Sequence, residues 1–151
     1  MTQTFKQVVG AGTSLTVTGL STLASATYCV SNAYDLTANQ PIDLVVELAA
    51  ATTNSPSGNQ QVMVFAQASW DGTNYQSGPT SGTTTTDEPN LTFLGVLPIA
   101  SSSVTERKGF SVAQAYGGVL PAKVKFVFKN DLGVALTSAS VQTTEISATV
   151  G

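Results

Sequence analysis

The chain contains no histidine and only one cysteine, Cys29. Histidine is the commonest general base and the commonest metal ligand, so its absence excludes many catalytic and metal-binding schemes. A single cysteine cannot form an intrachain disulfide or a metal-binding pair of thiolates, and we expect Cys29 to be a small buried apolar residue. The sequence therefore predicts neither a metal site nor a bound cofactor.

Charge is also scarce, since charged residues make up 10% of the chain against roughly 25% in an average globular protein. The net charge is −3, and there are only six lysines and arginines. Three of them lie close together, at Lys123, Lys125 and Lys129. This is too little positive charge to form an electrostatic footprint on nucleic acid, so direct binding of DNA or RNA is not expected.

Long apolar runs are missing as well. The chain has no segment of about 18 apolar residues, and we expect no membrane-spanning segment. Near the N-terminus Lys6 precedes the sequence VVGAG, but Thr and Ser interrupt this apolar run at once, unlike in a signal peptide. We therefore expect the protein to be made and folded in a cytoplasm.

Catalytic signatures are absent too. No G-x-S-x-G nucleophile elbow occurs, and a serine nucleophile would lack a histidine base. A glycoside hydrolase needs two carboxylates across a cleft, and a calcium site needs clustered oxygens; neither spacing is found. The candidate carboxylates are scattered and are interpreted as solvated: Asp43, Glu47, Asp71, Asp87, Glu88, Glu106, Asp131 and Glu145. We therefore expect no enzymatic activity, with a glycoside hydrolase as a remote alternative.

Threonine and serine take the place of the missing charges, with 22 and 16 residues respectively. β-Branched residues favour sheets, and 151 residues are enough for one domain that needs no disulfides or metals to fold. The clearest pattern is the alternation from Gln60 to Ser69, where one face carries valine and alanine at positions 62, 64, 66 and 68. Asp71-Gly72 then predicts a turn, and Thr73 to Tyr75 predict the start of a return strand, which together form a hairpin.

Similar alternation predicts further strands at residues 13–18, 28–36 (with a kink near Asn32), 42–50, 91–99, 110–115, 122–129 and 141–150. We expect Ile42 to face the core, and the odd-numbered residues from Leu91 to Ile99 to share one face. Residues 101–109 are predicted to be a polar connection. About eight strands without a convincing helix predict an all-β fold, an antiparallel β-sandwich resembling a jelly roll, over residues 13–151. Residues 1–12 are predicted to form an N-terminal arm.

Two segments are candidates for contact with a partner. In the N-terminal arm the apolar anchors would be Phe5, Val8 and Val9, although an ordinary frayed terminus is the alternative. Residues 76–90 form a polar segment without an apolar residue, and long loops of this kind are often functional. Its predicted contact residues are Thr84, Thr85, Asp87 and Glu88.

Trp70 and Tyr75 flank the predicted turn. Exposed aromatic side chains on a β-sandwich can stack on sugar rings, which would make this hairpin a ligand site. Alternatively, the two rings pack on each other across the hairpin or into a neighbouring loop.

The sequence S-W-D-G-T-N-Y at Ser69 to Tyr75 resembles the S-x-D-G-x-N-aromatic hairpin that is common in virion proteins of tailed bacteriophages. The whole chain is similar in composition to small head-decoration (cement) proteins and to some tail or fibre proteins: rich in Ser, Thr and Gly and poor in charge. This resemblance implies a structural protein of the virion, assembled in the host cytoplasm, with no catalytic residue.

The resemblance further implies a decoration protein that binds the major capsid protein on the outside of the shell and stabilises it. We expect a homo-oligomer, with a trimer suggested by local shell symmetry. A tail or fibre component of the same particle is one alternative. A carbohydrate-binding module or adhesin tip, using Trp70 and Tyr75, is another.

Overall fold

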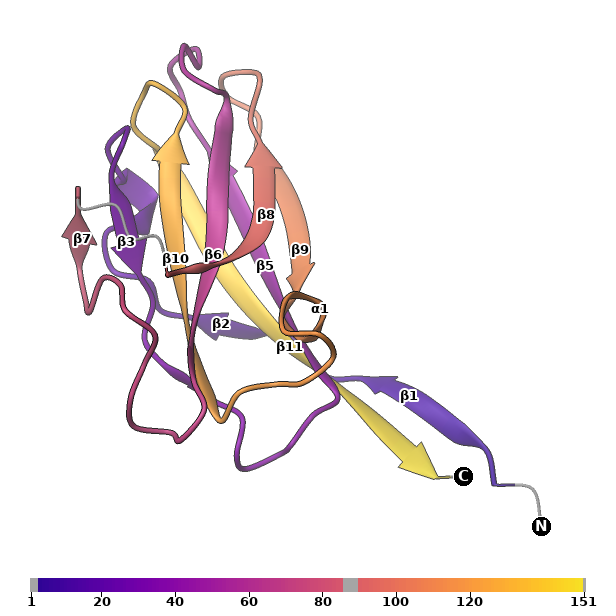
Figure 1. The fold of residues 1–151 in the computed structure, drawn as a ribbon. Helices are drawn as coiled ribbons and strands as arrows, with labels where there is room; N and C mark the ends of the chain where they lie inside the picture. The colour runs from indigo at the N-terminus through magenta and orange to yellow at the C-terminus, as the bar shows by residue number, and fades with distance from the viewer. Residues whose placement is uncertain (1–2, 86–89, 151) are drawn as a thin grey trace.

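The computed structural model describes residues 3–85 and 90–150, and these form two antiparallel β-sheets packed face to face (Figure 1). The predicted all-β sandwich is confirmed. The helices in the described residues are a 3₁₀ turn, η1 (Leu20–Thr22), and a single-turn helix, α1 (Val112–Ala115). None of the helices found there is long and apolar enough to cross a membrane.

The first sheet has the order β1-β11-β5-β9, and β2 also pairs with β11. Its strands are β1 (Phe5–Val9), β2 (Thr13–Leu15), β5 (Asp43–Ala51), β9 (Glu106–Ser111) and β11 (Ser138–Val150). The second sheet has the order β7-β3-β10-β6-β8, and β4 also pairs with β10. Its strands are β3 (Tyr28–Val30), β4 (Tyr34–Asp35), β6 (Gln61–Ser69), β7 (Thr83–Thr84), β8 (Thr92–Pro98) and β10 (Lys123–Asp131).

The pairing of the main strands is nested, as in a jelly roll. When the additional edge strands β1 and β7 are set aside, and β3 and β4 are counted as one interrupted position, eight strand positions remain. The first pairs with the last (β2 with β11), and the second with the seventh (β3 and β4 with β10). The third pairs with the sixth (β5 with β9), and the fourth with the fifth (β6 with β8). This is the pairing of one long hairpin that is folded over into two sheets.

The core lies between the sheets and follows the alternation of the strands. The four residues of β6 predicted to share a face are all buried: Val62, Val64, Ala66 and Ala68. Phe126 and Phe128 of β10 are the largest fully buried side chains, and Cys29 of β3 is buried beside them, as expected. Burial of apolar side chains at about 25 cal/mol per Å² is the main stabilising contribution in such a core.

One prediction about β8 is wrong. Phe93 was expected on the same face as Leu97 and Ile99, but it is half exposed and packs on Phe65, with ring centroids 5.5 Å apart. The register explains this, because Phe65 pairs with Phe93 while the preceding Val64 pairs with Gly95. The residue between Phe93 and Gly95, Leu94, is the additional residue of a β-bulge. The side chains of β8 that precede it therefore point to the face opposite to the one predicted.

The prediction for residues 101–115 is also wrong. The structure has a strand at Glu106–Ser111, where a polar connection was expected, and α1 where the strand was expected. β9 is an edge strand with Glu106, Arg107 and Lys108 at its start, and charged edges of this kind blur the apolar alternation. The Ser111 side chain accepts a hydrogen bond from the Gln114 amide and so caps the helix.

The predicted hairpin is half correct. β6 forms as expected, but residues 73–75 are not a strand, and β6 pairs instead with β8, which follows in the chain only after residues 70–91. The Asp71 carboxylate organises the turn by accepting hydrogen bonds from the amides of Thr73 (2.8 Å) and Asn74 (2.7 Å). Side-chain bonding to the backbone therefore takes the place of strand pairing here.

Candidate interaction surface

The two ends of the chain form a ribbon that projects from the sandwich (Figure 1). β1 pairs along its length with the last part of β11, from Phe5 opposite Val150 to Val9 opposite Ile146. The pairing of β11 with β5 ends where Ile146 meets Asp43. We call residues Phe5–Val9 and Ile146–Val150 the terminal ribbon; the segment predicted to be an arm is thus a paired strand over five of its residues.

One face of the terminal ribbon is apolar. Residues opposite each other and two apart share a face, which places Phe5, Val9, Ile146, Ala148 and Val150 together, with Gln7 between them. Ile146, at the base, is buried, so the exposed apolar part of this face is formed by the other four. All of β1 is exposed, with Phe5 at 71% and Val9 at 67%. The predicted anchors Phe5, Val8 and Val9 are therefore in one element, with Val8 on the opposite face. The C-terminal half of the face was not predicted, although the alternation of residues 141–150 signalled its strand.

The base of the ribbon is fixed by hydrogen bonds around Glu145. Its carboxylate accepts from the Tyr34 hydroxyl (2.9 Å) and from the Asn39 side-chain amide (2.8 Å). Burial, and then the bond to Glu145, raise the pKa of Tyr34 above its ordinary value. The Ile42 amide also donates to the Ile146 carbonyl (2.7 Å). The ribbon therefore leaves the sandwich in a defined direction.

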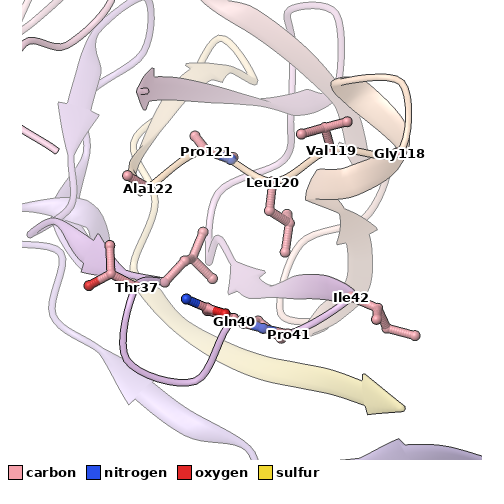
Figure 2. A pocket seen from close by; sticks show the side chains of 10 residues that line it. Thr37, Gln40, Pro41, Ile42, Gly118, Val119, Leu120, Pro121 and Ala122 are labelled. Carbon is pink, nitrogen blue, oxygen red and sulfur yellow. The ribbon is translucent and has the colours of Figure 1, made fainter. Parts of the chain in front are cut away.

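A pocket of about 440 Å³ opens beside this base, at the end of the sandwich (Figure 2). It is formed by the loop between β4 and β5 and the segment before β10. Its lining residues are Leu36, Thr37, Gln40, Pro41, Ile42, Gly118, Val119, Leu120, Pro121 and Ala122. Leu120 points across the space towards Gln40 and Pro41 (Figure 2).

The chemistry of the pocket is aliphatic. Thr37 and Gln40 supply the polar side chains, and the lining contains neither a charged nor an aromatic side chain. Ile42, predicted to face the core, is instead 51% exposed at the pocket, because β5 begins only at Asp43 and Ile42 lies at the open end of the sandwich. Such a pocket suits an uncharged apolar group and offers no ring for stacking on a sugar.

The aromatic residues near the turn do not form a common platform. Trp70 is 53% exposed and packs edge-on against Tyr116, with ring centroids 5.5 Å apart. Tyr116 donates its hydroxyl hydrogen bond to the Gln76 side-chain carbonyl (3.1 Å). Tyr75 has the Lys125 ammonium 4.6 Å from its ring centroid. Trp70 therefore packs into a neighbouring connection, and a cation occupies one face of Tyr75.

The predicted contact loop lies away from the terminal ribbon. Thr84 is in β7, which pairs with β3 at the other edge of the molecule, and Thr85 is exposed (Figure 1). Earlier in the loop, the Thr80 carbonyl accepts a hydrogen bond from Lys125 (3.1 Å). Asp87 and Glu88 lie outside the described residues. Thr84 and Thr85 are therefore not brought together with the predicted anchors Phe5, Val8 and Val9.

Several carboxylates have partners within the fold. Glu47 forms an ion pair with Arg107 (2.8 Å), and Asp43 accepts from the Ser111 hydroxyl (2.6 Å) and the Ala113 amide (2.9 Å). Over residues 3–85 and 90–150, no three His, Cys, Asp or Glu side chains are grouped so that they could hold a metal ion.

No protein-family model matches the chain, and no curated protein is similar to it in sequence. A function therefore has to rest on the surface of the molecule itself. Its most distinctive features are the terminal ribbon and the adjoining pocket.

Proposed function

We propose that this chain is a structural virion protein, a decoration protein that binds the outside of the shell of a tailed bacteriophage and stabilises it. The terminal ribbon is the observation that supports this role most. A two-stranded ribbon is marginally stable in water on its own, and contiguous exposed apolar patches larger than a few hundred Å² are rare on monomeric proteins. The exposed face around Phe5 and Val9 is therefore suited to holding the protein in a larger assembly.

The rest of the surface is compatible with this role. Threonine and serine can form wet, hydrogen-bonded interfaces without the cost of desolvating ions. Many weak contacts repeated by the symmetry of a shell give a high effective affinity. The jelly roll occurs in viral capsid proteins and also in lectin domains. The fold therefore does not distinguish these functions, and the support for a structural role comes from the terminal ribbon.

The test is binding to shells that lack the protein, prepared from the phage that encodes it. We expect saturable co-sedimentation of the wild type. Phe5→Asp should weaken binding at least about tenfold, because a charge on the apolar face opposes its burial. Val104→Asp, on an exposed apolar residue of the loop between β8 and β9, is the matched control and should bind like the wild type. Absence of binding, or recovery of the protein from tails alone, would contradict a decoration role.

The half-exposed Trp70 supports a second candidate, glycan binding. The measurement is a broad glycan array with the wild type and Trp70→Ala. Binding that disappears in the variant would favour a carbohydrate-binding module or adhesin tip. Silence across the array would count against it.

A further inference from the structure

We infer that the aliphatic pocket is the receptor for the terminal ribbon of a second copy of this chain, with Phe5 as the inserted side chain. This rests on the proposed structural role and names the partner of the ribbon. The contact would join two different surfaces, a ribbon on one copy and a pocket on the next.

A chain cannot fill its own pocket with its own ribbon. The β5 pairing reaches Ile146, and Glu145 is bonded to Tyr34 and Asn39, so the base of the ribbon is held in the sandwich. From this base the ribbon runs away from the molecule (Figure 1). Its apolar face therefore needs an occupant from outside.

The pocket and the ribbon form one continuous surface. Ile42 lines the pocket, and its amide donates to Ile146 at the base of the ribbon. Ile42 and Val119, which is 60% exposed, are the most exposed apolar side chains of the lining. A ribbon from a second copy would cover both residues while its own apolar face is covered in turn.

Size and charge also match. A cavity of 150 Å³ is enough to bind benzene, and this pocket has about 440 Å³, which leaves room for a phenyl ring and a neighbouring aliphatic group. The lining carries no charged side chain, and Lys6, the only charged side chain of the ribbon, lies on the face opposite Phe5. An uncharged apolar face thus meets an uncharged pocket.

Because ribbon and pocket are different surfaces, the contact is heterologous. Such a contact, repeated from copy to copy, forms a ring when the rotations between successive copies add up to a full turn. A trimer, as expected from shell symmetry, is one such ring. Pairing of two ribbons edge to edge would instead be a symmetric dimer contact that leaves the pocket empty. The two arrangements therefore differ in whether the pocket is needed.

The test mixes two variants, one defective in the ribbon and one defective in the pocket. Assembly of each variant and of the mixture is measured by native mass spectrometry and light scattering over a range of concentrations. Phe5→Asp disables the ribbon and Val119→Asp disables the pocket; both side chains are exposed, so both variants should fold. We expect each variant alone to raise the concentration of half-assembly at least tenfold, which corresponds to about 1.4 kcal/mol. Mixing them should give a 1:1 heterodimer, since one intact ribbon meets one intact pocket. Val104→Asp is again the matched control and should assemble like the wild type.

Three results would overturn the inference: a wild type that stays monomeric at high concentration, a Val119→Asp variant that assembles normally, or a mixture that forms no heterodimer. A benzophenone amino acid at position 5 gives a second readout. It should cross-link to the segment 118–122 of an isotopically labelled second copy, and cross-linking elsewhere would contradict the proposed site. Shell binding is measured separately, so a monomer that binds shells overturns only this inference. An oligomer that does not bind shells overturns only the proposed function.

Discussion

Cys29 lies in the core, and burial raises the pKa of its thiol from an ordinary value of 9.0 to about 12. The native thiol is therefore protonated at pH 8 and shielded from reagents. We expect it to react with a thiol reagent such as DTNB about 100-fold more slowly than in the unfolded chain. Equal rates in the native and unfolded protein would contradict this burial.

The same residue gives a pH dependence of stability. The unfolded thiol ionises near pH 9, whereas the native thiol stays protonated up to about pH 12, so the unfolded state gains relative stability across this window. We expect urea denaturation at pH 8 and pH 10.5 to show a loss of stability at the higher pH that is smaller in Cys29→Ala. An identical loss in both proteins would show that the thiol contributes nothing to it.

Asp71 illustrates the opposite shift. Hydrogen bonds from the Asn74 and Thr73 amides, and from the Asn74 side chain, hold the pKa of its carboxyl well below its ordinary value of 3.8. The bonds that it accepts are present above pH 4 and weaken as the pH falls through the lowered pKa. We expect an NMR titration to place this carboxyl below 3.8, and Asp71→Ala to speed amide exchange at Thr73 and Asn74. A midpoint at or above 3.8 would contradict the turn described here.

At the scale of elements, the strands differ in what they contribute to folding. Phe126 of β10 is fully buried, so Phe126→Ala should lower the free energy of unfolding by about 3–5 kcal/mol. Phe5 of β1 is exposed, and Phe5→Ala should change it by less than about 0.5 kcal/mol when measured at a concentration where the protein is monomeric. Urea denaturation of both variants checks this. A loss of several kcal/mol for Phe5→Ala would mean that the ribbon is part of the cooperative core.

Strands with a buried and an exposed face could be predicted from alternation, which is why β5, β6, β10 and β11 were found. β9 was missed because an edge strand tolerates charged residues. The side-chain direction of Phe93 was missed because a bulge depends on register with the neighbouring strand, which local sequence does not contain. The return strand after Asp71 was wrong because side-chain bonds to the backbone closed the turn in another way.

The candidate surface could be predicted only in part. Phe5, Val8 and Val9 were recognised because an apolar cluster in a polar arm is visible in the sequence. Their pairing with β11 joins the two ends of the chain, and the pocket joins the segments 36–42 and 118–122. Both arise from the nested strand order, so only the folded structure brings these residues together.

At the scale of the whole molecule, the two parts serve different purposes. The jelly roll is a well-packed body, whereas the ribbon and the pocket are apolar surfaces at one end of it. Elsewhere the surface is rich in hydroxyl groups and poor in charge, which limits repulsion between neighbours. This combination is compatible with the decoration role proposed above.

The proposed decoration role is tested most directly by a cryo-electron microscopy reconstruction of phage particles produced from a genome that carries this sequence. We predict jelly-roll density on the outside of the shell, with the terminal ribbon of each copy covered by protein and Phe5 in the pocket of its neighbour. Particles without the protein on their shells, or with the ribbon exposed to solvent in every copy, would contradict it.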